Sequence, residues 1–395
     1  MPHRLWPDVT TLARLLRSLQ LVTVTFRPQF QATVSGQADD REPAHGRGGP
    51  VSPRLPRVRT RLTDLAEQAG VSTATVSRVL NGKNGVSTQT RQAVLAALDL
   101  LGYERPEKLH TRSAGLVGLV VPELTNPVFP AFAQVVESML SEAGYTPLLC
   151  TQSPGGTTED QYVEMLLEHA VAGIVFISGL HADTTAGRDR YHRLRSRGMP
   201  IVLVNGYAEG VDAPAVSSDD AAAMDLAFRH LISLGHRRIG LAIGPERFVP
   251  SQRKVTAFTD NLARHLGDTE PADHIVTTLF TVEGGQAAAG ELIATGHTAI
   301  ICGSDLMALG AIRAARARGL DVPADISVVG YDDSPLIAFT DPPLTTVRQP
   351  VQAMGHAAVS ALVAEINGVR GTRTELLFHP ELIVRGSTGV APAVR

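Results

Sequence analysis

The sequence has little that would support a disulfide framework, a cysteine-rich metal centre or a membrane span. Only two cysteines, Cys150 and Cys302, occur in 395 residues, and two thiols cannot build a disulfide scaffold or a cysteine-rich zinc site. The apolar runs, such as 116–121, have the length of a strand and not of a bilayer-spanning helix. No small-residue cleavage site follows the apolar patch near the N-terminus, which argues against a secretory signal. We therefore expect a cytoplasmic protein with no membrane partner.

Excess charge of one sign is also absent overall, but charge is unevenly distributed along the chain. The 36 Lys and Arg nearly balance the 39 Asp and Glu, for a net charge of −3, which excludes a histone-like polycation. Residues 53–112 nevertheless hold ten Lys or Arg against five Asp or Glu, a local net of +5 that leaves −8 for the remainder. A small basic module joined to a larger acidic body favours phosphate binding, although a basic stretch is often only a solvated surface.

The residue patterns divide the chain into four parts. Residues 1–57 have no steady hydrophobic period and end in a stretch rich in proline, arginine and glycine, so we expect a disordered extension. Whether this extension belongs to the natural protein stays open. Residues 58–105 predict three short helices, 106–115 a linker, and 116–395 a larger α/β body. At 44% hydrophobic residues, the chain can bury the cores that two or three domains require.

Residues 62–81 have the spacing of a helix-turn-helix. Ala66 falls where two helices cross, Gly70 supplies the turn, and Ser72 can cap the second helix. The side chains that face outward near the start of that helix suit the major groove of DNA: they are Thr73, Ala74, Thr75, Ser77 and Arg78. Further candidate DNA contacts are Thr63, Ser72, Asn81 and Ser87. The alternative is an ordinary helical hairpin with a solvated polar face.

The body from 116 onward alternates continuous apolar runs with amphipathic helical stretches. Such alternation is typical of parallel sheets covered by helices on both faces. About ten strands are expected, which favours two sheets of five or six over one large sheet. We therefore predict two lobes: the first from about 116 to 206 with a C-terminal return, and the second from about 207 to 345.

Several segments resemble the LacI/GalR family of bacterial transcriptional regulators. In the basic module they are 63–72 (TDLAEQAGVS), 75–82 (TVSRVLNG), 86–91 (VSTQTR) and 101–103 (LGY). In the body they include 117–122 (VGLVVP), 235–240 (GHRRIG), 302–311 (CGSDLMALGA), 329–333 (VGYDD) and 344–350 (LTTVRQP). The resemblance covers roughly 60–388. It implies a small all-α headpiece, then two Rossmann-like subdomains arranged as in type I periplasmic binding proteins, and a homodimer on a near-palindromic double-stranded operator.

The linker departs from the family pattern. Members usually carry an Ala-Arg-x-Leu hinge helix whose leucine wedges into the minor groove, and residues 104–115 lack that motif. Leu109 is the apolar candidate for such a wedge, and Pro106 is compatible with the first turn of a short helix. A flexible tether with Leu109 incidental is the equal alternative.

Polar and aromatic residues at the predicted carboxyl ends of strands indicate a small-molecule site between the lobes. Aromatic faces beside carboxylate and amide groups suit a polyhydroxylated ring: the candidates are Phe129, Asn205, Phe280, Ser304, Asp305 and Asp332. The alternatives are core packing for the two phenylalanines, a helix cap for Asp305 and a turn for Asp332. The resemblance adds Lys254, where the family usually has arginine. Among the effector contacts that the resemblance implies, Asp332 is the best supported.

Motifs of the common enzyme classes are missing. We find no dinucleotide-binding or Walker loop after the first strand, no nucleophile elbow and no zinc-protease motif. We therefore predict a sequence-specific DNA-binding repressor that needs no cofactor or metal and responds to a carbohydrate effector. Two alternatives remain, a solute-binding protein without a DNA role and a sugar-modifying enzyme.

Overall fold

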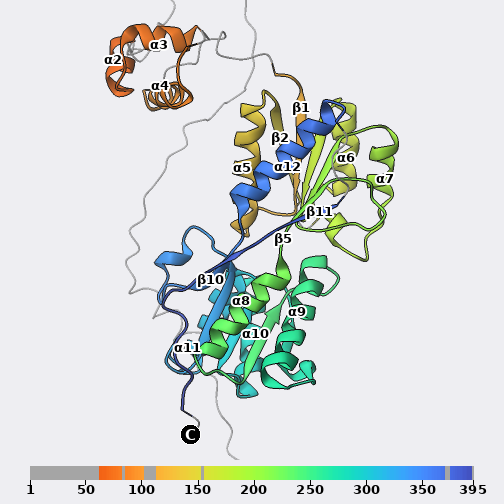
Figure 1. Cartoon of the computed structure of the whole chain (residues 1–395), viewed down its shortest axis with the longest axis vertical. Helices are drawn as coiled ribbons and strands as arrows, with labels where there is room; N and C mark the ends of the chain where they lie inside the picture. Colours follow the sequence, from red (N-terminus) through yellow and green to blue (C-terminus); the bar gives the residue numbers. More distant parts are fainter. Residues whose placement is uncertain (1–61, 82–84, 102–112, 153–154, 370–373, 394–395) are drawn as a thin grey trace, which may run out of the picture. The chain divides into compact units, whose positions relative to one another are not determined.

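A computed structural model describes residues 62–81, 85–101, 113–152, 155–369 and 374–393. The predicted N-terminal extension, Leu109 and most of the linker lie outside these residues. The description therefore covers a three-helix headpiece and an α/β body, each of which is considered by itself (Figure 1).

The headpiece consists of helices α2 (Leu62–Gln68), α3 (Thr73–Leu80) and α4 (Thr88–Leu100). Ser72 and Ser87 cap α3 and α4, since each hydroxyl accepts a hydrogen bond from the backbone N–H three residues later. Gly70 adopts a left-handed φ of 63°, which glycine tolerates without steric cost. A small common core includes Leu65, Val76 and Leu98. The three predicted helices and the predicted cap at Ser72 are confirmed.

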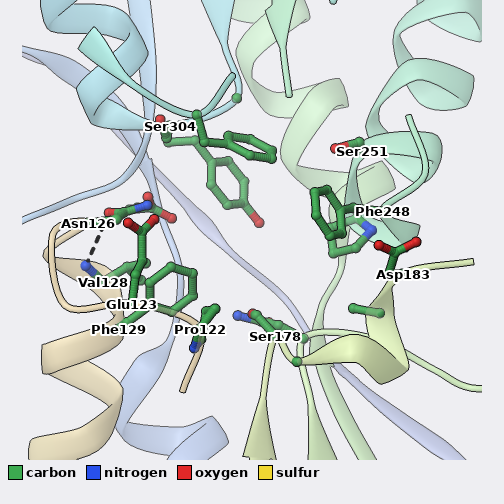
Figure 2. A pocket seen from close by; sticks show the side chains of 18 of the residues that line it. Pro122, Glu123, Asn126, Val128, Phe129, Ser178, Asp183, Phe248, Ser251 and Ser304 are labelled. Atoms are coloured by element: carbon green, nitrogen blue, oxygen red, sulfur yellow. Dashed lines mark hydrogen bonds between the residues drawn. The ribbon is translucent and has the colours of Figure 1, made fainter. Parts of the chain in front are cut away.

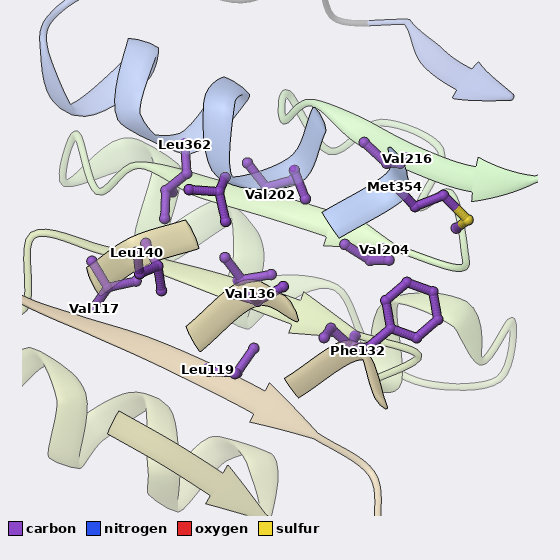
Figure 3. Close-up of a cluster of buried hydrophobic side chains, with 14 of the residues drawn as sticks. Val117, Leu119, Phe132, Val136, Leu140, Val202, Val204, Val216, Met354 and Leu362 are labelled. Atoms are coloured by element: carbon purple, nitrogen blue, oxygen red, sulfur yellow. The ribbon is translucent and has the colours of Figure 1, made fainter. Parts of the chain in front are cut away.

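The first lobe is built on a parallel six-stranded sheet in the order β11-β5-β4-β3-β1-β2. Its strands are β1 (Leu116–Val121), β2 (Thr146–Thr151), β3 (Gly173–Ile177), β4 (Ile201–Val204), β5 (Ala215–Ser218) and β11 (Glu375–Phe378). Helices α5 (Val128–Glu142) and α12 (Val351–Ile366) cover one face and bury a core around Phe132 and Leu362 (Figure 3). Helices α6 (Glu159–Glu168) and α7 (Asp189–Ser196) cover the other face, over Phe176 and Tyr191.

The second lobe has a six-stranded sheet in the order β12-β10-β9-β8-β6-β7, in which only β12 pairs antiparallel. Its strands are β6 (Ile239–Ile243), β7 (Ile275–Thr277), β8 (Ala299–Cys302), β9 (Ser327–Asp332), β10 (Thr345–Arg348) and β12 (Glu381–Ile383). Helices α8 (Asp220–Ser233) and α9 (Val249–Leu266) share one core, and α10 (Val282–Ala294) and α11 (Asp305–Ala317) share the other. Three short 3-10 turns complete the body: Leu180–Ala182, Pro271–His274 and Ile337–Phe339.

The chain passes between the lobes three times, after β5, after β10 and between β11 and β12. The sequence-based lobe boundary at 206/207 is therefore wrong, because β5 pairs with β4 and β11 and keeps residues to Ser218 in the first lobe. The C-terminal return to the first lobe consists of α12 and β11, whereas β12 joins the second sheet. The two-sheet architecture itself matches the prediction.

Candidate functional site

Helix α3 presents a polar surface made of short side chains and one guanidinium. Thr73, Ala74 and Arg78 are exposed, while Thr75 and Ser77 are half-buried. The opposite side of the helix is fixed in the headpiece core by Val76 and Val79. A convex helix with short hydroxyls and an arginine can enter a major groove and reach base edges.

The other candidate DNA contacts already take part in hydrogen bonds within the headpiece. The hydroxyls of Ser72 and Ser87 cap helices, and the Asn81 amide donates to the Ser77 carbonyl oxygen at 2.7 Å. Thr63 is exposed and its hydroxyl lies 3.4 Å from an oxygen of Asp64. Ser72 and Asn81 thus fix the two ends of α3, and we expect them to act on DNA binding chiefly through the shape of that helix, whereas Thr63 lies on α2 and Ser87 caps α4.

A cavity of about 390 Å³ lies between the lobes and is lined by residues of both. In Figure 2 the side chains of Glu123 and Phe129 lie on one side and those of Asp183 and Phe248 on the opposite side. The lining includes six of the seven candidate effector residues: Phe129, Asn205, Lys254, Phe280, Ser304 and Asp332. The carboxyl ends of strands in both sheets thus meet at one cavity.

Asp305, the seventh candidate, does not line this cavity. Its buried carboxylate accepts hydrogen bonds from the Ser334 N–H at 2.7 Å and the Thr346 hydroxyl at 2.6 Å. Burial raises the pKa of Asp305 to about 6. The sequence placed it correctly at the start of a helix but could not show that the second lobe itself uses both oxygens.

Asp332 belongs to a hydrogen-bonded chain that joins the lobes through Gln349. The Gln349 amide donates to Asp332 Oδ1 at 2.7 Å, and the Asn205 amide donates to Gln349 Oε1 at 3.2 Å. The pKa of Asp332 is raised well above its ordinary range, first by burial and then by the nearby Asp305 carboxylate. A buried carboxyl that can accept or share a proton suits recognition of ligand hydroxyls.

The Lys254 ammonium already has interaction partners within the protein. Its ammonium forms a buried ion pair with Asp220 Oδ1 and lies 4.1 Å from the centre of the Tyr331 ring. The Tyr331 hydroxyl donates to the same Asp220 oxygen at 3.2 Å. Burial raises the pKa of Asp220, against the opposing effect of Lys254. All three side chains line the cavity, and removing either Lys254 or Asp220 would leave the other as an unpaired buried charge.

Three phenylalanines supply apolar walls. Phe129 and Phe280 are half-buried and pack against the cores of their lobes while also lining the cavity. The Arg247 guanidinium lies over the Phe248 ring, with Cζ 4.9 Å from the ring centre. Both sequence-based interpretations of Phe129 and Phe280, core and cavity wall, therefore describe the same side chains.

Sequence reasoning missed several lining residues that carry charge or position others. They are Glu123, Asp183, Asp220, Tyr331 and Gln349. Gln349 and Tyr331 were visible inside motifs, and Asp220 is the first residue of α8, two positions after β5, but their neighbours come from distant parts of the chain. Burial raises the pKa of Glu123, a half-buried carboxyl that lines the cavity together with Asp183, Asp220 and Asp332.

The described residues contain no cluster of three or more His, Cys, Asp or Glu suited to holding a metal. Cys150 and Cys302 are buried free thiols, and burial raises the pKa of Cys150 to about 11. In the part of the chain that the structure describes, no helix is both long and apolar enough to span a bilayer.

Comparison with known proteins adds two family matches. Residues 61–106 match the model of bacterial regulatory proteins of the lacI family, and residues 228–388 match that of the periplasmic binding protein-like domain. An uncharacterised HTH-type transcriptional regulator in the aml 5' region of Streptomyces limosus is 64% identical over 88% of this chain and 97% of its own length. The HTH-type transcriptional regulator MalR of Streptomyces coelicolor is 62% identical over 85% of this chain and 98% of its own.

Solved structures agree with these relatives. A complex of the transcriptional regulator CelR with cellobiose has 32% identity and a TM-score of 0.61, covering 83% of this chain and all of that one. A lac repressor dimer bound to operator and an anti-inducer has 26% identity and a TM-score of 0.60, covering 84% and 99%. Both combine DNA-regulating function with the two-lobed fold described above.

Proposed function

This chain belongs to the lacI family of bacterial regulatory proteins, and from that premise we propose that it represses transcription as a homodimer whose operator binding responds to a carbohydrate. The observation that carries the proposal is a single chain with both an exposed helix-turn-helix surface on α3 and a cavity between two lobes that combines apolar walls with polar groups. A solute-binding protein has no use for the former, and a constitutive DNA-binding protein has none for the latter.

The cavity chemistry supports a polyhydroxylated ligand. Asp332, Asn205 and Gln349 offer acceptors and donors in one chain, and the phenylalanines offer apolar faces for C–H groups. The cellobiose bound to the related CelR regulator gives a precedent for a sugar in this fold. We infer that the chain acts by binding and not by catalysis, in the cytoplasm, where a bacterial operator is accessible.

Regulation requires the carbohydrate to bind two lobe arrangements with unequal affinity, since equal affinity shifts no equilibrium. Because Gln349 lies at the second crossing between the lobes and contacts both Asp332 and Asn205, a ligand at Asp332 is positioned to bias the interlobe angle. That angle would in turn set the spacing of the two headpieces across the dimer.

DNA binding is tested by a gel shift of the full chain on the intergenic DNA upstream of its own gene, at two salt concentrations and with non-specific competitor. We expect a discrete shift that survives competitor and weakens with salt. If that DNA is not shifted, the fragments of the whole genome that the protein binds are selected and their binding sites are mapped by footprinting. Failure to select any site would refute the repressor proposal.

The effector site is tested with a panel of mono- and disaccharides, scored by thermal stabilisation and by change of the gel shift. Asp332→Ala should weaken binding of the active sugar at least tenfold, about 1.4 kcal/mol, and leave operator binding intact. Asp260→Ala, an exposed aspartate on α9, is the matched control. Full sugar response in Asp332→Ala would show that the site lies elsewhere.

A further inference from the structure

Two loops from opposite lobes meet at one rim of the cavity. Asp183 and Thr184 follow β3 in the first lobe, and Arg247 and Phe248 follow β6 in the second. We call these four residues the clasp. The Thr184 N–H and hydroxyl both donate to the Arg247 carbonyl oxygen, at 2.8 and 2.9 Å, and Asp183 pairs with Phe248 as an isolated antiparallel bridge.

Side chains reinforce this backbone contact. Arg247 Nε lies 3.0 Å from Asp183 Oδ2, while the other oxygen of Asp183 accepts from the Thr185 N–H at 2.9 Å and the Thr185 hydroxyl at 2.6 Å. The carboxylate is therefore oriented by its own loop before Arg247 reaches it. All of these partners belong to the protein, so the contact needs no ligand to form.

The first-lobe side of the clasp is anchored from beneath by a buried glutamate. Glu159, fully buried, accepts the Leu180 N–H at 2.9 Å and the Tyr191 hydroxyl. A Cβ on Gly179 would lie 2.5 Å from Glu159 Oε2, so the loop rests directly on the carboxylate. A buried charge is costly to maintain, and here it fixes the loop that carries Asp183 and Thr184.

The clasp lies far from the segments that connect the lobes. Those segments adjoin β11 and β5 in the first sheet and β12 and β10 in the second, whereas the clasp loops follow β3 and β6. At about 4.8 Å per strand, β3 is about 14 Å from the β11 edge and β6 about 19 Å from the β12 edge. A rotation of about 15° about the connections would separate the clasp by about 4 Å. Hydrogen bonds of 2.8 to 3.0 Å cannot survive that displacement.

We propose that the clasp is a built-in latch that holds the lobes closed over the cavity without effector and thereby regulates the site. This inference rests on the proposed function, because it assigns a regulatory element to the same cavity. Because the clasp contacts already favour the closed arrangement of the lobes, the carbohydrate has to contribute less binding free energy to close them. Effector affinity and operator affinity then both depend on the clasp, of which Asp183, Arg247 and Phe248 also line the cavity.

Cysteine trapping tests the latch directly in the full chain. Asp183 and Phe248 form a non-hydrogen-bonded antiparallel pair, for which Cα atoms are about 4.5 Å apart, within the range of a disulfide. Asp183→Cys/Phe248→Cys should therefore lose both new thiols under mild oxidant with no sugar present. Cys150 and Cys302 are buried and should stay unreactive. New thiols that remain free in the folded protein would overturn the proposal.

A second double-cysteine variant tests the contact in case loss of the Phe248 ring prevents the first variant from folding. Thr184→Cys/Arg247→Cys joins the neighbouring position of the bridge and keeps both Asp183 and Phe248. We expect it to cross-link as well, since opposite residues there lie about 5.5 Å apart. If the first pair fails to fold and the second folds without cross-linking, the latch is refuted.

Regulation by the clasp is measured by comparing the oxidised and reduced forms of each double-cysteine variant. The two forms have the same side chains and differ only in the disulfide. Operator affinity should differ at least tenfold between the two forms in gel shifts. Equal affinities with a formed disulfide would refute regulation by the clasp. Absence of operator binding in both forms and in the wild type would instead refute the repressor proposal, while the thiol count would still report on the contact itself.

Discussion

Replacing Gly244 by alanine should remove carbohydrate binding without unfolding the protein. An ideal Cβ at Gly244 would lie 2.0 Å from Cε2 of Phe280 and 2.3 Å from two further ring atoms. Carbon atoms pack at about 3.5 to 4.0 Å, so the ring must retreat by about 1.5 Å or more. Phe280 is half-buried and lines the cavity. The ring can therefore move, and the cavity wall moves with it.

The direction of that movement decides the result. A Cβ at Gly303 would itself lie 3.1 Å from Cε1 of Phe280 and 2.7 Å from Ile243, so the ring is held between two glycines and has no room to slide along the sheet. It must turn into the cavity, where it takes space that the ligand needs. Loss of one aromatic contact costs about 0.5 to 1.5 kcal/mol, and the steric conflict adds to it. We expect at least a tenfold loss of sugar affinity.

The assay is titration calorimetry with the sugar identified by the panel, together with thermal melting and an operator gel shift. Gly187→Ala is the matched control, because its Cβ would meet no atom within 4 Å and its φ is not left-handed. The control should behave as wild type in all three measurements. The reasoning fails if Gly244→Ala binds the sugar normally, or if both variants lose affinity to the same extent.

Two further outcomes follow from the headpiece and from buried histidines. Arg78→Ala should weaken operator binding at least fivefold, because an exposed arginine on a recognition helix commonly contributes about 1 to 3 kcal/mol at a guanine; unchanged binding in the gel shift would remove Arg78 from the interface. Burial lowers the pKa of His181 to about 4, so on acidification the unfolded state takes up the proton first, below about pH 6.5. Stability should fall between pH 6.5 and 4, and His181→Gln should flatten that part of the melting-temperature profile, whereas an unaltered profile would exclude His181 as a cause.

Local patterns were enough to predict the headpiece. Helix caps, the turn glycine and the apolar spacing act within a few residues of one another, so Ser72, Gly70 and Val76 lie where the sequence indicated. The strands of both lobes were equally visible, because fully buried parallel strands are continuous apolar runs. The short strands β10, β11 and β12 were missed: β10 reads Thr-Thr-Val-Arg and β11 exposes Leu376 and Leu377, so neither is a continuous buried apolar run.

The candidate site was predictable only in part, because its chemistry depends on pairings between distant segments. A family resemblance predicts Lys254 as a ligand contact. It could not show that Asp220, 34 residues away in the chain, takes up the ammonium. Asp305 illustrates the same limit: its position at the start of a helix was clear, but its bonds to Ser334 and Thr346 depend on how β9 and β10 pair.

The ion pairs already formed by the cations that line the cavity limit which groups are left to bind a ligand. Lys254 is balanced by Asp220, and Arg247 is balanced by Asp183 within the clasp. Asp332 instead accepts from neutral amide donors, Gln349 on Oδ1 and the Asn126 side chain, in a backbone conformation of φ 115° that non-glycine residues rarely adopt. Strain of this kind persists where surrounding structure enforces it, commonly at binding sites. Recognition should therefore depend on acceptor groups at Asp332 and its neighbours, while the cations hold the walls and the latch in place. A ligand rich in hydroxyl donors satisfies that arrangement without breaking either ion pair.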